Sequence, residues 1–409
     1  MPRSEWAIIV AVVISLTACD RPDTVGLVEP VEVEPAFAAQ GASNPALIAH
    51  GREIFRFETF GDETFWTDTL RMHEVIRESV SPNTALAVGL KVDVDALPPG
   101  VIAGIRSGDV DLGDPATTVA LLGLGAVLGV VGQVEAGTLT RVGITCALCH
   151  STVDDSFAPG IGSRLDGWPN RSLDVGRIIA LSRSRALSPA QRRVYNSWGP
   201  GMYDPRYNLD GLNIPVVLPP AFGLQHVKME TYTGDDVVSY WNAYVAITQM
   251  HGHGHFVDAR IGVDVDNPPD LVSSKLEPLR AYQLSLETPA PVEGEFDAGA
   301  ALRGQEVFNG LAGCASCHLG GALTDVGANR LHAAADVGQD PAYALRSVTK
   351  LYRTTPLRGL WHPPQLVGPY FHDGSAPTLE AVVDHYVELF GLDLTWEHKA
   401  DLVEYLKTL

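Results

Sequence analysis

The feature that most constrains this chain is a five-residue pattern, Cys-x-x-Cys-His, which occurs twice, at residues 146–150 and 314–318. With five cysteines and 13 histidines available, chance would produce it about 0.002 times. A redox Cys-x-x-Cys motif does not need the histidine, and a zinc site would need a second ligand pair close by. The spacing is typical of c-type haem attachment, in which two thiols bond the porphyrin and the imidazole binds iron. The sequence therefore predicts two covalently bound haem c groups, held by Cys146, Cys149, His150, Cys314, Cys317 and His318.

The N-terminus predicts export. Arg3 precedes an apolar run from Ala7 to Leu16 that is too short to cross a hydrocarbon core of about 30 Å as a helix. The run ends at Ala18 and Cys19, which resembles a bacterial lipoprotein signal with an acylated cysteine; an ordinary secretory signal and an uncleaved anchor are the alternatives. We expect residues 1–18 to be a signal peptide and residues 19–43 a proline-containing tether. The folded part would then lie in the periplasm, anchored to a membrane through a lipid on Cys19.

The charge of the chain bears on its partners. Lys and Arg total 29 and Asp and Glu total 49, which gives a net charge of −20. This balance excludes a nucleic-acid-binding role, because phosphates require a basic surface. It favours electrostatic steering of a basic protein such as a small cytochrome.

Two repeated segments predict the domain organisation. Residues 51–55 are echoed at 304–308, and the leucine and tyrosine spacing of residues 279–286 recurs at 402–409 on one helix face. An opening helix, a haem motif and a closing helix resemble class I cytochrome c domains. We therefore expect an all-α fold of two tandem cytochrome c-like domains, at about 44–287 and 297–409, joined by a segment of linker composition.

The first domain is predicted to carry an insertion at about residues 58–140. Within it, Asp114 and Pro115 form a helix start, with an N-cap acid before a proline. The apolar run from Val119 to Val131 that follows is too short and too rich in glycine to span a membrane. We expect this run to pack against the first haem.

The second half carries the clearest family resemblance. Residues 353–360, 369–375 and the Thr378-Leu379 pair resemble the di-haem cytochrome c peroxidase superfamily, which includes the methylamine dehydrogenase maturation enzymes. The resemblance is close over residues 301–409 and loose over 146–250, and it does not extend to the insertion. It implies an electron-transfer haem in one domain and, in the other, a peroxidatic haem that binds peroxide at an open axial position.

The axial ligand of the second haem follows partly from counting. None of the five methionines lies after Met250, so the second domain cannot supply a methionine ligand. Where the peroxidases place that methionine this chain has Tyr386, and the resemblance to the maturation enzymes implies a tyrosine ligand there. The alternatives are His385, an open site, or a Tyr386 that is simply a core aromatic.

For the first haem, residues 231–234 fall where the superfamily has an aromatic-glycine turn, and Met250 is the candidate ligand. The peroxidases carry a catalytic glutamate beside this methionine, whereas this chain has Gln249, which cannot shuttle a proton as a carboxylate does. Tyr232 stands where the superfamily has a tryptophan thought to relay electrons between the haems. A core position in the turn is the alternative for Tyr232.

The remaining candidates are histidines and calcium ligands. His251, His253 and His255 alternate with glycine, so an extended segment would place them on one face, to hold a metal or line a pocket; a solvated loop is the alternative. His372 is expected to organise the pocket, whereas His73, His226, His332 and His398 are expected to be structural. The resemblance implies calcium between the domains, with Asn170 and Thr355 as weak candidate ligands.

Three functions fit these features. The first is a peroxidase-like oxidoreductase that reduces hydrogen peroxide at one haem with electrons passed from the other, supplied by a small redox protein such as a cytochrome c or a cupredoxin. The second is a non-enzymatic, lipid-anchored electron carrier. The third is an oxygenase-type haem enzyme that acts on an organic substrate. Gln249 favours the last two, whereas the insertion favours an enzyme.

Overall fold

The computed structural model describes residues 26–27, 44–225, 227–360 and 368–409. The predicted signal peptide, Cys19, most of the tether and His226 lie outside the described residues. Among the described residues, no helix has both the length and the apolar character needed to cross a membrane.

The fold is a mixture of helices and strands, which corrects the all-α prediction. About 42 % of the structure is helical and 13 % is strand, and the described strands form six two-stranded sheets. The largest sheet pairs β3 (Val130–Glu135) with β4 (Thr138–Ile144) inside the predicted insertion. Ala136 and Gly137 connect the two strands with positive φ values of 47° and 78°. Two such residues make the tight turn that matches strand twist, so a hairpin forms where we expected helix.

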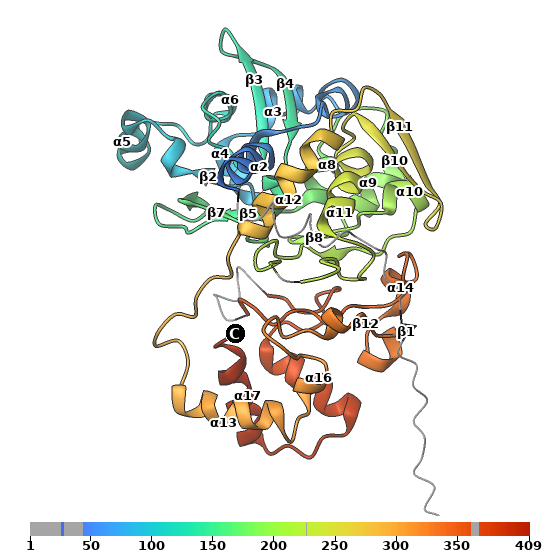
Figure 1. Cartoon of the computed structure of the whole chain (residues 1–409). Helices are drawn as coiled ribbons and strands as arrows, with labels where there is room; N and C mark the ends of the chain where they lie inside the picture. Colours follow the sequence, from blue (N-terminus) through green and yellow to red (C-terminus); the bar gives the residue numbers. More distant parts are fainter. Residues whose placement is uncertain (1–25, 28–43, 226, 361–367) are drawn as a thin grey trace, which may run out of the picture.

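The elements divide into two groups on either side of residues 286–297, which carry no helix or strand (Figure 1). The described helices of the first group are α2 (Pro45–Phe57), α3 (Met72–Ser79), α4 (Pro82–Ala87), α5 (Pro99–Ser107), α6 (Pro115–Gly123), α7 (Ala147–His150), α8 (Val175–Ala180), α9 (Pro189–Tyr195), α10 (Tyr207–Asp210), α11 (Val238–Tyr244) and α12 (Leu276–Ser285). Its other strands are β2 (Val92–Asp93), β5 (Ser151–Val153), β6 (Ile161–Gly162), β7 (Arg164–Asp166), β8 (Met202–Tyr203), β9 (Val216–Val217), β10 (Gly254–Asp258) and β11 (Val263–Asn267). The second group has α13 (Ala298–Asn309), α14 (Pro341–Ala344), α16 (Leu379–Phe390), α17 (Trp396–Leu406) and β12 (Arg330–Leu331), which pairs with β1 (Gly26–Leu27).

The sequence repeat corresponds to two similar helix pairs, α2 with α12 and α13 with α17. In the first pair the rings of Phe55 and Tyr282 meet edge to face at 5.4 Å and 64°. In the second pair Phe308 and Tyr405 meet at 5.2 Å and 67°. Each half therefore closes its opening helix against its last helix with the same aromatic contact. The domain boundaries themselves stay a prediction.

A glycine allows each of these helix pairs to approach closely. A Cβ on Gly304 would lie 1.9 Å from the carbonyl oxygen of Asp401, and one on Gly51 would lie 1.8 Å from that of Pro278. Replacing Gly304 by alanine should therefore lower the free energy of unfolding by about 1–3 kcal/mol, the usual cost of overpacking. Gly299→Ala, on the exposed start of the same helix, is the matched control. Urea unfolding of both variants tests this. Equal free energies of unfolding for Gly304→Ala and Gly299→Ala would show that α13 and α17 can move apart to accept the added methyl group.

The helix predicted at Asp114 is present, but the apolar run has a different partner from the one expected. Asp114 caps α6, accepting the N–H of Ala116 at 2.9 Å. Val119, Leu121 and Leu122 then pack in a core of their own with Leu139 and other insertion residues, and residues 119–131 do not line the large cavity described below. This placement corrects the expectation that the run packs against the first haem.

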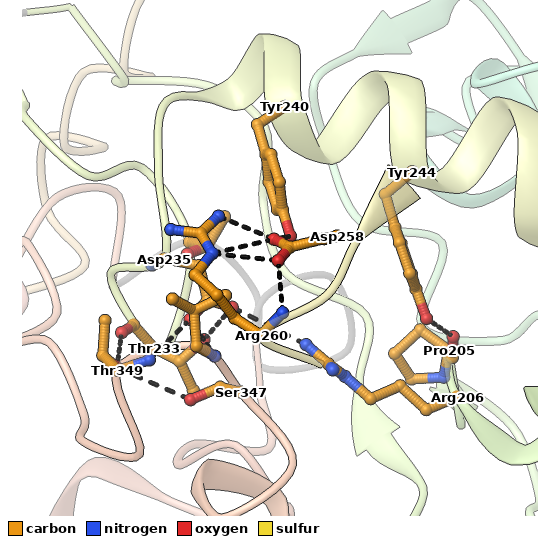
Figure 2. A network of polar contacts seen from close by, with 12 residues as sticks. Pro205, Arg206, Thr233, Asp235, Tyr240, Tyr244, Asp258, Arg260, Ser347 and Thr349 are labelled. Atoms are coloured by element: carbon orange, nitrogen blue, oxygen red, sulfur yellow. Dashed lines mark hydrogen bonds and ion pairs between the residues drawn. The ribbon is translucent and has the colours of Figure 1, made fainter. Parts of the chain in front are cut away.

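The two halves are joined by buried polar contacts (Figure 2). Asp235, in the first half, accepts the N–H groups of Val348 and Thr349 at 2.9 and 3.3 Å. The hydroxyl of Thr349 donates to the carbonyl of Thr233 at 2.6 Å. Arg346 also pairs with the buried Asp204 at 3.0 Å across the same junction. Because these charges are paired and hydrogen-bonded, they fix how the second half sits on the first.

Candidate haem-binding site

One cavity of about 1040 Å³ connects the two Cys-x-x-Cys-His motifs. The volume is at the upper end of the range for small-molecule pockets, about 300–1,000 Å³. Each motif contributes the side chains predicted to bind haem, and these lining residues are Cys146, Cys149, His150, Cys314, Cys317 and His318. The structure therefore brings two motifs 168 positions apart in the sequence to a single hollow, as two neighbouring cofactors require.

The first motif lies on the short helix α7. The residue that precedes the motif is hydrogen-bonded to the insertion. The N–H of Thr145 donates to the carbonyl of Gly129 at 3.0 Å. A Cβ on Gly129 would lie 2.0 Å from the backbone nitrogen of Leu148, and the φ of Gly129 is +70°. A glycine is therefore required there for the insertion to support the motif.

Both motif histidines are oriented for iron binding. Nδ1 of His150 donates to the carbonyl of Pro219 at 3.1 Å, and Nδ1 of His318 donates to that of Leu323 at 3.0 Å. A carbonyl can only accept, so Nδ1 carries the proton and Nε2 keeps the lone pair, the usual arrangement of a metal-binding histidine. Burial lowers the pKa of His150 to about 4 and also lowers the pKa of His318, which keeps both rings neutral.

The four motif cysteines do not suit thiolate chemistry. All are free and partly buried. Burial raises the pKa of Cys146 and Cys149 to about 12 and that of Cys314 to about 11. The reactive cysteine of a redox Cys-x-x-Cys motif has a pKa near 7 or below. The donor set, the cavity and the histidine tautomers therefore fit haem rather than disulfide exchange.

The predicted distal residues of the first half all line the cavity. Met250 and Gln249 are buried at the end of the π-helical turn Val245–Gln249, and Tyr232 lies where the two halves meet. The hydroxyl of Tyr232 donates to the carbonyl of Val217 at 3.3 Å, and its own carbonyl accepts the N–H of Arg353 at 2.9 Å. The structure thus places Met250 and Gln249 side by side and Tyr232 at the junction.

The amide of Gln249 is held by three hydrogen bonds. Its Oε1 accepts from the hydroxyl of Tyr203 at 2.9 Å. Its Nε2 donates to Oδ1 of Asn208 at 3.1 Å and to Oγ1 of Thr248 at 2.9 Å. Tyr203 and Asn208 could not be identified from the sequence, because no local pattern connects them to Gln249, which lies more than 40 positions away.

Of the three alternating histidines, only His251 faces the cavity. Its ring stacks on Phe65 with centroids 3.7 Å apart, and burial lowers its pKa to about 4. His253 donates from Nδ1 to the carbonyl of Pro268, and His255 is exposed beside Asp266. The structure does not bring the three imidazoles together, so the predicted shared face is wrong. The backbone turns at His251, whose φ is +64°, and this turn breaks the alternation.

In the second half, Tyr386 lines the cavity from α16, whereas His385 does not. Nε2 of His385 instead donates to the carbonyl of Val337 at 3.0 Å. Burial raises the pKa of Tyr386 to about 12, so its phenol stays protonated near neutral pH unless a metal ion binds it. Of the two predicted ligands, the geometry favours Tyr386.

Replacing Tyr386 by phenylalanine tests this ligand. We expect the absorption and electron paramagnetic resonance spectra of the second haem to change, because a phenolate stabilises ferric iron by charge donation. Tyr405→Phe is the matched control, because Tyr405 packs on Phe308 in the same half. Unchanged spectra in Tyr386→Phe would remove Tyr386 as a ligand.

The other predicted polar residues have partners within the protein. His372 is buried on the cavity wall and hydrogen bonds through Nε2 to the hydroxyl of Tyr352 at 3.0 Å, in keeping with an organising role. His332 pairs with Asp325 at 3.0 Å. The buried amide of Asn170 donates to Gly89 and accepts from Ser172, while Thr355 lines the cavity. Calcium at Asn170 and Thr355 stays a prediction.

The class of protein follows from this geometry: two c-type haem-attachment motifs that share one cavity define a di-haem cytochrome. The chain is 36 % identical over 125 residues to the methylamine utilization protein MauG of Methylorubrum extorquens, covering 27 % of this chain and 34 % of that protein. Over that part of the chain, this similarity supports the resemblance to the superfamily of the di-haem cytochrome c peroxidases and the methylamine dehydrogenase maturation enzymes.

The extent of these similarities is limited. The chain spans about a third of the length of the curated relative it matches, and no protein-family model matches it. Two solved structures share local similarity. One is Kuenenia stuttgartiensis hydrazine synthase under 20 bar xenon, with 26 % sequence identity and a TM-score of 0.25. The other is a MauG-like protein associated with microbial copper homeostasis, with 23 % sequence identity and a TM-score of 0.26. Each covers 36 % of this chain, with 57 % and 62 % of the other chain matched. At these scores the similarity does not define the fold.

Proposed function

We propose that this protein is a peroxidase-type di-haem oxidoreductase, which takes electrons at one haem and reduces hydrogen peroxide at the other. The observation that carries the proposal is the single cavity lined by both haem motifs and by Gln249, Met250 and Tyr386. Bound haem would supply iron that exchanges electrons and binds peroxide.

The residues of the chain would divide the remaining work. His150 and His318 would hold the irons through Nε2, because backbone carbonyls fix the proton on Nδ1 of each ring. Tyr232 offers an aromatic ring at the junction between the halves for electron passage. The lining, which is mostly apolar and aromatic, would lower the local dielectric around bound haem and strengthen electrostatic interactions there.

The location and partners are part of the same proposal. A signal peptide and a lipid on Cys19 would hold the protein at a bacterial membrane in the periplasm. A net charge of −20 would steer a basic donor, such as a cytochrome c or a cupredoxin, toward the surface.

Steady-state reduction of peroxide with reduced cytochrome c as donor tests this proposal, together with the electron paramagnetic resonance spectrum of the oxidised protein. We expect turnover and a high-spin ferric signal from one haem with an open axial position. Two low-spin haems without turnover would overturn the proposal.

One observation favours a second candidate, the non-enzymatic electron carrier. Gln249 stands where the peroxidases have their catalytic carboxyl group. Its amide is fixed by three hydrogen bonds and is not an acid near neutral pH, so it cannot transfer a proton to peroxide. Two low-spin signals with fast electron exchange would be the signature of that carrier.

A further inference from the structure

Arg353 is a partly buried arginine that reaches from the second half into the first. Its backbone N–H donates to the carbonyl of Tyr232 at 2.9 Å, and its Nη1 donates to the carbonyl of Met229 at 3.2 Å. The side chain lines the cavity. Its Nε is buried and, among the described residues, has no hydrogen-bond partner. A guanidinium with an unused buried donor is costly unless an acceptor arrives.

The carboxylate of Glu230 interacts electrostatically with Arg353, but its oxygens are bound to other groups. Glu230 accepts the N–H of Val238 at 2.8 Å through Oε2 and pairs with Arg280 at 3.4 Å through Oε1. Burial lowers the pKa of Arg353 to about 10, so the side chain is poorly solvated and still cationic near neutral pH. The cavity lining therefore carries the positive charge of the Arg353 guanidinium, which Glu230 neutralises only in part.

A second arginine lies in the same wall. Arg171, from the first half, also lines the cavity, and both arginines lie close enough to Tyr232 to act on it electrostatically. Burial lowers the pKa of Arg171 as well. The junction between the halves thus presents two guanidinium groups, one from each half, to the hollow in which the haem motifs meet.

We propose that Arg353, with Arg171 beside it, binds the propionate carboxylates of bound haem at the junction of the two halves. A planar guanidinium pairs with a carboxylate through parallel hydrogen bonds, and such charge-assisted bonds are the strong ones in a buried site. This proposal rests on the proposed di-haem function but not on peroxide turnover. Arg353 is then a positioning residue, which fixes the orientation of a haem and sets its reduction potential.

The physical consequence is a shift in potential. A positive charge near the porphyrin disfavours the ferric state, which carries one charge more than the ferrous state. Losing that charge should therefore lower the midpoint potential of at least one haem. A residue that only filled space or closed the interface would leave the potential where it is.

Redox titration of the haem-loaded full chain, followed by absorption in acetate-free buffer, tests the proposal. Arg353→Gln should lower one midpoint potential, and Arg353→Lys, which keeps the charge, should shift it less. Arg192→Gln is the matched control: Arg192 is partly buried, donates to the carbonyls of Ala180 and Ser184, and does not line the cavity, so its loss should reduce stability without moving the potentials. If Arg353→Gln does not fold, Arg171→Gln gives the same readout.

Each outcome decides the proposal. Unchanged potentials in a folded Arg353→Gln or Arg171→Gln variant would overturn it, as would equal shifts in Arg353→Gln and Arg192→Gln. A shift that appears only after acetate is added would assign the arginines to a free carboxylate instead. A protein that binds two haems but does not reduce peroxide would still give this readout, so the two proposals can fail separately.

Discussion

Replacing both Cys314 and Cys317 by alanine should leave the protein with one covalently bound haem per chain in place of two. Both thiols line the cavity beside His318, and neither is held in a disulfide. Without the thioether bonds, the second haem would be held by axial ligation and packing alone. We expect denaturing mass spectrometry to find one haem addition and peroxide turnover to be lost, because the electron path would lack one of its two centres.

Two controls make this result specific. Ser316→Ala removes a hydroxyl that donates to Sγ of Cys317 at 3.9 Å but keeps both thiols, and it should keep both haems. The corresponding double substitution at Cys146 and Cys149 should also leave one haem, now in the second half. Two haem additions in the first variant would show that residues 314–318 are not an attachment site, and the redox proposals would then lose their basis.

These residues were predictable from the sequence because haem attachment requires its ligands within five consecutive positions. The geometry that completes the site is of another kind. Tyr203 reaches Gln249 across 46 positions, and Arg353 meets Tyr232 across the junction of the halves. Such contacts depend on how two distant segments pack, and no spacing in the chain encodes them. Arg171, also on the cavity wall, was missed for the same reason.

The fold divides in the same way. The helix pairs at the start and end of each half were predictable, since their apolar faces repeat with helical spacing and each needs a glycine at the crossing. Most of the strands were missed because they are only two to five residues long, and the longer pair, β3 and β4, lies largely within an insertion whose sequence showed no family resemblance. The apolar Val142 and Ile144, which alternate with Arg141 and Gly143 before the first motif, and the Ala136-Gly137 turn were the available signals for the hairpin.

Gln249→Glu should raise peroxide turnover by on the order of 10²-fold, the lower end of what general acid–base catalysis contributes. The surroundings of Gln249 would keep the new carboxyl protonated. Thr248 donates its hydroxyl proton to the carbonyl of Tyr244 at 2.6 Å, so its Oγ1 can only accept from position 249. Asn208 likewise presents Oδ1 there. A carboxylate would face two acceptors, whereas a neutral carboxylic acid can donate to one of them.

The same reasoning gives the pH dependence. Burial and these acceptors raise the pKa of an introduced carboxyl, so it would be a proton donor below that pKa. The gain should therefore be largest at acidic to neutral pH and should disappear as the pH rises through the pKa. In the wild type, the amide of Gln249 does not titrate, so it contributes no such pH dependence to turnover.

Gln283→Glu is the matched control for this experiment. Gln283 is also a buried glutamine on the cavity lining, with its amide paired to Asn242 at 2.7 and 3.2 Å. The same change of one atom there should bring no gain, because Gln283 is not beside Met250. If Gln249→Glu folds, carries two haems and still shows wild-type turnover, then the absent carboxylate does not limit peroxide chemistry. Equal gains in both variants would instead point to a general effect of added negative charge near the haems.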